Sequence, residues 1–463
     1  MGAAPMSGAR FTSGSTMRHV AVMAATGSAG LLALFLVDAL NLFYISLLGI
    51  TELAAAIGFA GTIQFFIVSV SIGIMIGGST NISHEIGAGG RERAQSLAGS
   101  ALLTAALLMT IGGALVWIWR REALMLLGAE GAALDAASDF IAITLISMPM
   151  LGISMGCSGT LRAIGAARQA MWVTLSGGML AAMLDPLLIF GFGLELTGAA
   201  ISMVTTRTVM AGIGLWFVIH GHRMAVWPRF SEWISDLRPL LAVALPAIAT
   251  QLSTPFGNAY LTSTVAEYGD GAVAGWAVVG RLSALAFGGI FALAGAVGPI
   301  VGQNYGAWLP LRIRTTYRDA LLFVLAYVAV AWVVLWFSLD PIVAGFGLDE
   351  AGAGVVAAFV HGGAGAFIFT GALFVSNAAF NNLGRPIWST GFNWTRDALA
   401  IPGLALLLGP VLGLAGAVWI QALAAILVGS LAAIAGWATI TRLDAAGDRR
   451  GQIAPATLPP YCS

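Results

Sequence analysis

Residues 31–44 read Leu-Leu-Ala-Leu-Phe-Leu-Val-Asp-Ala-Leu-Asn-Leu-Phe-Tyr, an apolar segment with one carboxylate, Asp38, in its middle. The apolar run continues on both sides and is long enough to cross a bilayer as a helix. A carboxylate inside such a helix raises the insertion free energy by at least about 2.5–3.5 kcal/mol, so it usually faces a cavity and has a function. The segment therefore predicts a membrane helix in which Asp38 lines a water-filled cavity.

The whole chain has the composition of a membrane protein. Of its 463 residues, 59% are hydrophobic and 9% are charged, whereas soluble domains carry about 25% charged residues. The net charge of zero argues against a nucleic-acid partner. The sequence contains no catalytic dyad, metal-ligand cluster or phosphate-binding loop, and its two cysteines form no metal or disulfide framework. We therefore expect a protein that is not an enzyme and has no cofactor.

Twelve apolar spans predict an all-α polytopic membrane protein. They cover residues 19–49, 52–84, 94–119, 136–160, 169–191, 196–219, 239–266, 271–303, 319–338, 352–382, 387–409 and 413–440. The most hydrophilic connection lies midway and predicts a linker between two six-helix lobes. The expected organisation is an N-terminal tail (1–18), an N-terminal lobe (19–219), a linker (220–238), a C-terminal lobe (239–440) and a C-terminal tail (441–463).

Loop charges predict the orientation of these spans. Sixteen arginines fall on one side, whereas the other side has only Arg120 and Arg121 together with ten acidic residues. By the positive-inside rule, both termini are cytoplasmic. We expect a multi-pass protein of the bacterial cytoplasmic (inner) membrane.

An internal repeat relates the two predicted lobes. The segment 82–88 (Ile-Ser-His-Glu-Ile-Gly-Ala) aligns with 301–307 (Val-Gly-Gln-Asn-Tyr-Gly-Ala), and 162–165 aligns with 381–384, both at an offset of 219. Gly198-Ala-Ala aligns with Gly416-Ala-Val at an offset of 218. Six spans in each half give a parallel repeat, and such transporters place their substrate site at the repeat interface.

These motifs resemble the multidrug and toxic compound extrusion (MATE) transporters. The resemblance rests on Asp38 followed by the segments 49–55, 86–89, 161–165, 184–190 and 198–201, and then on Pro246, Gly306-Ala307 and 382–386. It implies a two-lobed antiporter that exports organic cations or other amphipathic compounds in exchange for protons or sodium. The expected partners are small organic substrates and membrane lipids, and the protein is expected to be monomeric.

Asp38 and Asp185 are the candidate coupling residues. At 1.5 Å per residue, both acids lie roughly 25–29 Å from the inner face, so they can share one cavity in the N-terminal lobe. Two carboxylates in a pocket of low dielectric constant resist double ionisation, which suits a proton carrier or a cation site. The resemblance points the same way, since acids at these positions couple transport in the family. In the alternative interpretation, Asp185 only caps backbone groups beside Pro186.

The sequence also departs from the family pattern. Ala181 stands where an asparagine often precedes the acid of span five. The NorM-like branch has acids in spans seven and ten, whereas those spans here contain no carboxylate at mid-span. Their polar residues are Gln251, Asn258, His361, Asn377 and Asn381. This pattern favours a DinF-like arrangement, with coupling in the first lobe.

Three arginines lie within spans. Arg396 adjoins Asp397, which predicts charge neutralisation inside the bundle or, alternatively, binding of an anionic group of the substrate. Arg207 and Arg281 are further candidates for coupling or substrate binding, as are His361 and the aromatic Tyr44. A flippase for a lipid-linked glycan is the alternative function, but it should have a basic cluster in its cavity. Within the predicted spans, only Arg207, Arg281 and Arg396 are available to form such a cluster.

Overall fold

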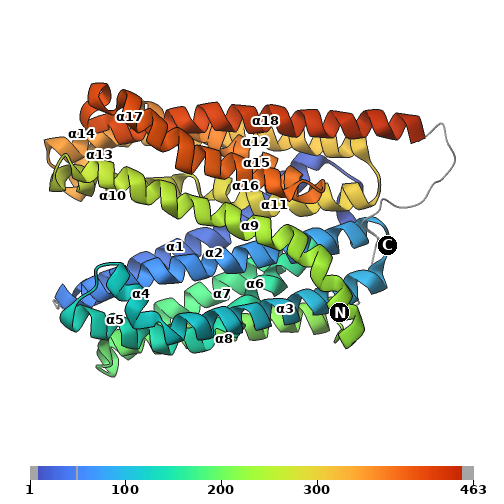
Figure 1. The fold of residues 1–463 in the computed structure, drawn as a ribbon, viewed down its shortest axis with the longest axis horizontal. Coiled ribbons are helices and arrows are strands. Elements are labelled where there is room, and N and C mark those ends of the chain that lie inside the picture. Colours follow the sequence, from blue (N-terminus) through green and yellow to red (C-terminus); the bar gives the residue numbers. More distant parts are fainter. Residues whose placement is uncertain (1–8, 48–50, 451–463) are drawn as a thin grey trace. The chain divides into compact units, whose positions relative to one another are not determined.

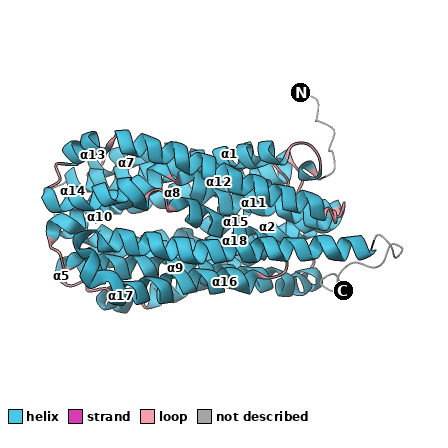
Figure 2. Cartoon of the chain, turned by 90° about the horizontal axis from the view of Figure 1, so that it is seen from above, coloured by secondary structure: helices cyan, strands magenta, loops and turns pink. Residues whose placement is uncertain are grey.

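The computed structural model describes residues 9–47 and 51–450, and the regular elements in those ranges are all helical, joined by short loops (Figure 2). Side chains at 34–35, 37–43, 45–47, 51–52, 54 and 444–450 lie outside the described residues. Apolar residues cover most of each helix surface, as expected for helices that cross lipid.

The helices of the first half are α1 (Thr16–Leu47), α2 (Thr51–Gly87), α3 (Arg91–Ile118), α4 (Arg120–Leu126), α5 (Gly131–Thr144), α6 (Met148–Ala163), α7 (Ala167–Pro186) and α8 (Glu195–Leu215). Those of the second half are α9 (Phe230–Ala266), α10 (Asp270–Ala286), α11 (Gly288–Gly306), α12 (Pro310–Phe337), α13 (Leu339–Phe346), α14 (Glu350–Ala358), α15 (Phe367–Asn382), α16 (Pro386–Trp394), α17 (Ile401–Leu412) and α18 (Gly416–Arg450) (Figure 1).

The expected internal repeat is visible in the helix boundaries. Helices begin at residues 51 and 270, 91 and 310, 120 and 339, 131 and 350, 148 and 367, and 167 and 386, with an offset of 219 in every pair. The two halves of the chain therefore break their helices at equivalent places.

The twelve expected spans correspond to α1, α2, α3, α5–α6, α7, α8, α9, α10–α11, α12, α14–α15, α16–α17 and α18. Two of them are bent at a break, by 46° between α10 and α11 and by 62° before α15. The apolar stretch 386–443 is 58 residues long, too long for one crossing. The chain turns at Gly413, whose φ is +58°, and α17 then packs beside α18.

The described chain divides into two compact units. Unit 1 comprises residues 1–28, 83–89 and 249–463, and unit 2 comprises residues 29–82 and 90–248. In unit 1, α15 packs against α11, α12 and α18; in unit 2, α3 packs against α6, and α8 against α6 and α7. These boundaries differ from the expected lobes 19–219 and 239–440, because α1, α2 and α9 each contribute residues to both units.

The expected linker at 220–238 contains helical residues at both ends. A π-helical turn extends α8 to Gly221, and α9 begins at Phe230, so the connection is only 222–229. The polar residues that suggested a longer linker sit in the first turns of α9, where Asp236 bonds to Ser100 on α3. The C-terminal tail, expected from 441, likewise begins as helix, because α18 continues to Arg450.

Candidate functional site

Asp185 is a buried acid at a break in α7. Its side chain is 1% exposed. Pro186, the next residue, has no N–H to donate, and a π-helical turn follows at Leu187–Gly191 (η3). Among the described residues, neither carboxylate oxygen of Asp185 has a hydrogen-bond partner. An ionised carboxylate is unstable when it is buried without a partner, so such a group either takes up a proton or binds a cation.

Two hydroxyls on α8 share this lack of partners. Ser202 is buried and lies close enough to interact with the Asp185 carboxylate. Thr206 follows one turn later on the same face of α8. Within the described ranges, the hydroxyl oxygens of both residues are buried and make no hydrogen bond of standard geometry. Carboxylate and hydroxyl oxygens are the ligands that small hard cations prefer, so this side of unit 2 has the chemistry of a proton or sodium site.

Arg207 is the next residue on α8, and its guanidinium is the centre of a second polar group in unit 2. It is 7% exposed and donates to Gln64 Oε1 at 2.9 Å and to Ser147 Oγ at 3.2 Å. Gln64 in turn donates to Thr144 Oγ1 at 2.7 Å. Thr144 and Ser147 lie at the short 3₁₀ turn (Leu145–Ser147, η2) that separates α5 from α6. A buried cation is thus held in the apolar interior of unit 2.

The remaining N-terminal candidates are on α1. Asp38 lies on this helix, but its side chain is outside the described residues, so its pairing with Asp185 stays a prediction. Tyr44 packs its ring edge-on against Phe190, with the ring centroids 6.0 Å apart, and contacts the apolar core of unit 2. Phe190 belongs to the π-helical turn that follows Asp185, so α1 and the break in α7 are in contact.

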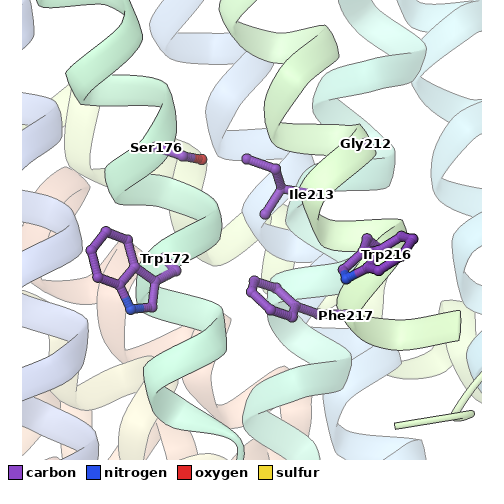
Figure 3. Close-up of a pocket in the computed structure, with 6 residues that line it drawn as sticks. All are labelled: Trp172, Ser176, Gly212, Ile213, Trp216 and Phe217. Atoms are coloured by element: carbon purple, nitrogen blue, oxygen red, sulfur yellow. The ribbon is translucent and has the colours of Figure 1, made fainter. Parts of the chain in front are cut away.

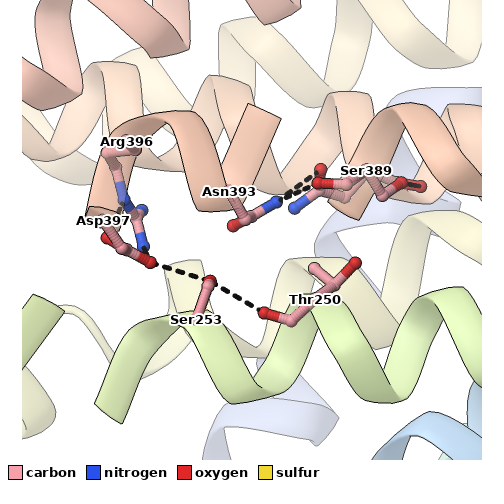
Figure 4. Close-up of polar contacts among 7 residues, drawn as sticks. Thr250, Ser253, Ser389, Asn393, Arg396 and Asp397 are labelled. Carbon is pink, nitrogen blue, oxygen red and sulfur yellow. Dashed lines mark hydrogen bonds and ion pairs between the residues drawn. The ribbon is translucent and has the colours of Figure 1, made fainter. Parts of the chain in front are cut away.

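Arg396 and Asp397 form a buried ion pair in unit 1, as the sequence predicted. They are 8% and 3% exposed, respectively. Arg396 donates from Nε to Asp397 Oδ1 at 2.7 Å and from a terminal nitrogen to Oδ2 at 3.0 Å. Ser253 on α9 donates to the same Oδ2 at 2.8 Å (Figure 4). Both charged residues belong to a π-helical turn, Thr395–Ala400 (η6). The predicted neutralisation of Arg396 by Asp397 inside the bundle is confirmed.

An amide and hydroxyl cluster continues from this pair along α16. Asn393 donates to Asn377 Oδ1 at 3.1 Å, and Ser389 donates to Asn381 Oδ1 at 3.0 Å. Thr390, also on α16, lies 3.2 Å from the Thr250 hydroxyl of α9. Two expected residues of span ten, Asn377 and Asn381, are therefore brought together with α16. Each contributes a side-chain oxygen as an acceptor.

The other expected candidates lie elsewhere. Asn258, Arg281 and His361 are exposed on the surface of unit 1, and Gln251 is half-buried. The His361 ring meets Trp336 edge-on at a centroid distance of 4.8 Å, near the end of α12. Among the described contacts, none joins these four residues to the Arg396–Asp397 cluster, and their roles stay predictions.

Several polar residues of these clusters were absent from the sequence-based candidates. They are Gln64, Thr144, Ser147, Ser202, Thr206, Thr250, Ser253, Ser389, Thr390 and Asn393. One signal in the sequence could have found some of them. Ser202, Thr206 and Arg207 interrupt an apolar span at helical spacing, and intramembrane polar residues are costly and often functional.

Comparison with known proteins points to one group of transporters. The chain matches the sequence profile of the MatE family over residues 28–187 and again over 246–406, once in each half. A FAD transporter of Shewanella oneidensis is 29% identical over 371 residues, covering 79% of this chain and 82% of that protein. Multidrug export protein MepA of Staphylococcus saprophyticus is 25% identical over 406 residues, covering 84% and 88%.

Solved structures share the same fold. MATE in complex with MaL6 matches with a TM-score of 0.88 at 20% identity, covering 94% of this chain and 99% of that one. The outward-facing conformation of a multidrug resistance MATE family transporter of the MOP superfamily matches with a TM-score of 0.86 at 21% identity, covering 94% and 98%. The expected all-α architecture of twelve membrane helices in two lobes is confirmed.

Proposed function

The chain belongs to the MatE family of MATE transporters, and we propose that it is a secondary active antiporter that exports amphipathic or cationic organic compounds. Export is driven by the entry of protons or sodium through alternating access of two lobes. The protein acts as a monomer in the cytoplasmic membrane, with both termini inside. Its substrates are small organic compounds, and no step requires a cofactor or covalent chemistry.

The observation that carries this proposal is Asp185, a buried carboxylate whose two oxygens lack hydrogen-bond partners among the described residues. A proton neutralises this group, and a sodium ion gains ligands from it and from the nearby hydroxyl of Ser202, with the hydroxyl of Thr206 one turn further along α8. Binding of the ion and binding of the substrate then alternate. Asp38 on α1 is proposed as the second coupling acid.

The polar residues of unit 1 also favour ion coupling in the first lobe rather than in the second. The buried acid described there, Asp397, is already neutralised by Arg396 and bonded to Ser253. A carboxylate with these partners is poorly suited to release and take up a proton during transport. The chain therefore follows a DinF-like arrangement, in which unit 1 shapes the substrate path and unit 2 carries the ion.

The relative described as a FAD transporter favours a second candidate substrate class. At 29% identity over most of both chains, export of an anionic dinucleotide is the second function to test. The buried guanidinium of Arg396 is the group in unit 1 that suits a phosphate, provided that Asp397 is displaced. A lipid-linked glycan is less favoured, because its flippase should have a basic cluster in the cavity. Arg207 and Arg396 belong to different units and each already has bonding partners, and Arg281 is exposed.

The test is transport by the purified full chain in liposomes. Ethidium efflux is measured under an imposed proton gradient and, separately, under a sodium gradient, and FAD uptake is measured in the same vesicles. Ethidium transport that Asp185→Asn or Asp38→Asn abolishes supports the antiporter and identifies its ion. Transport by either variant at the wild-type rate would remove that residue from the mechanism. FAD transport without ethidium transport would make the second substrate class the correct one.

A further inference from the structure

A groove runs between α7 and α8 on the surface of unit 2 (Figure 3). Trp172 and Ser176 of α7 form one wall, and Gly212, Ile213, Trp216 and Phe217 of α8 and its π-helical continuation form the other; the cavity has a volume of about 420 Å³. The two tryptophans are 47% and 62% exposed. A Cβ added at Gly212 would meet no atom within 4 Å, so the glycine keeps the groove open.

Both helices that form this groove are long and apolar enough to cross a membrane. Exposed tryptophans on such helices face lipid, and they concentrate at the headgroup level, where the ring is buried and the indole N–H can donate a hydrogen bond. In Figure 3 the indole nitrogen of Trp172 lies on the side of the ring away from Ser176, toward the start of α7. By the distribution of arginines, this end of α7 is predicted to be cytoplasmic.

Helical spacing places a cation at that end of the groove. Arg168, Trp172 and Ser176 are spaced by four residues, so they follow one face of α7. Arg168 is exposed. On the opposite wall, His220 stacks on Trp216 with the ring centroids 4.8 Å apart, and Arg223 follows in the connection to α9. The groove is therefore apolar toward the membrane centre and basic at its mouth.

We propose that this groove binds an anionic phospholipid of the cytoplasmic leaflet, with an acyl chain between Trp172 and Phe217 and the headgroup phosphate at Arg168. Basic pockets between membrane helices on the cytoplasmic side suit anionic headgroups. A zwitterionic lipid fills the apolar part equally well, so Arg168 supplies the preference for negative charge. The site lies within unit 2, and the inference does not depend on the proposed transport function.

The experiment uses the purified, delipidated full chain and native mass spectrometry, with phosphatidylglycerol or phosphatidylcholine of identical acyl chains added. We expect tighter binding of phosphatidylglycerol by about fivefold, since a basic residue near an anionic surface contributes on the order of 1 kcal/mol. Arg168→Gln should abolish this preference but keep lipid binding. Gly212→Leu, which fills the groove, should weaken binding of both lipids. Free glycerol phosphate, which lacks acyl chains, should not bind.

The matched control for the second variant is Gly112→Leu on α3. Gly112 is also an exposed helical glycine with no atom within 4 Å of an added Cβ, but it lies outside the groove. This variant should bind both lipids like the wild type. Equal affinity of the wild type for the two lipids would overturn the proposal, as would unchanged binding in both Arg168→Gln and Gly212→Leu. Glycerol phosphate binding comparable to that of the lipid would instead indicate a site for a free anion.

Discussion

Gly87 and Gly306 occupy equivalent positions of the internal repeat, and each faces the backbone of the other's helix. A Cβ added at Gly87 would meet the carbonyl oxygen of Gln303 on α11, and one added at Gly306 would meet the carbonyl oxygen of His84 on α2. Gln303 and His84 are themselves 219 residues apart. The Gly-Ala motif that reveals the repeat in the sequence is therefore also the place where the ends of α2 and α11 approach closely within unit 1.

The first prediction concerns these two glycines. Gly87→Ala and Gly306→Ala should each destabilise the protein by about 1–3 kcal/mol, because the added methyl group has no space and the helix ends must separate. Thermal unfolding in detergent measures the effect. Gly112→Ala is the control, and it should be neutral or slightly stabilising, since alanine favours a helix over glycine. Equal stability of all three variants would contradict the close approach of α2 and α11 at Gly87 and Gly306.

The second prediction compares Arg93 with its repeat partner Arg312. Arg93 is 43% exposed and pairs with the buried Asp236; a lysine keeps the positive charge that this single contact needs, so Arg93→Lys should change stability by less than about 1 kcal/mol. Arg312 donates to the carbonyl oxygens of Phe11, Ser13 and Gly14 and to the side chain of Asn304. A lysine cannot make this set of bonds. Arg312→Lys should therefore lower the unfolding temperature more than Arg93→Lys, and the reverse order would refute the argument.

The third prediction separates structural from functional roles of the ion pair in unit 1. Asp397→Asn leaves the Arg396 guanidinium buried without a counter-charge and should destabilise the protein by about 3–5 kcal/mol. The double variant Arg396→Met with Asp397→Leu should recover most of that loss, because no buried charge remains. Transport assays of this double variant then decide the role of the pair. Ethidium and FAD transport at the wild-type rate would mean that the Arg396–Asp397 pair has a structural role only.

The fourth prediction addresses the coupling ion. Ser202→Ala removes the hydroxyl that lies close to Asp185, and Thr206→Val keeps the shape of its side chain but removes a buried hydroxyl one turn further along α8. If sodium drives transport, each variant should raise the sodium concentration needed for half-maximal efflux by about tenfold, as expected for one lost ligand of 1–2 kcal/mol. If protons drive transport, both variants should keep near wild-type rates. Loss of efflux under both gradients would instead indicate a packing defect.

The fifth prediction concerns topology. A membrane-impermeant reagent should label a cysteine introduced at Arg121 from outside intact cells, and one at Arg314 only after permeabilisation, as the positive-inside rule requires. Both positions are on described helices and lie on opposite sides of the predicted membrane: Arg121 is on α4 and Arg314 is near the start of α12. Labelling of both from one side would overturn the span order. Of the two background cysteines, Cys157 is buried, and Cys462 is replaced by serine in both variants.

Sequence alone predicted the class of fold because hydropathy and loop charge are properties of the chain in one dimension. The twelve spans and the offset of 219 residues follow from such patterns, and so does the position of an acid such as Asp185 inside a span. The helical ends of the predicted linker, 220–238, were missed for a related reason. Polar residues such as Asp236 look like a loop when their partners on other helices are unknown.

Only the tertiary structure decided which polar groups meet. The bonds of Arg207 to Gln64 and Ser147, and the closeness of Ser202 to Asp185, depend on how each helix is rotated about its axis and how closely it packs. Hydropathy does not encode that rotation when a helix is apolar on all sides. The same reason explains the division into compact units. Segments of α1, α2 and α9 join their unit by side-chain contacts between residues more than a hundred positions apart, which no local pattern records.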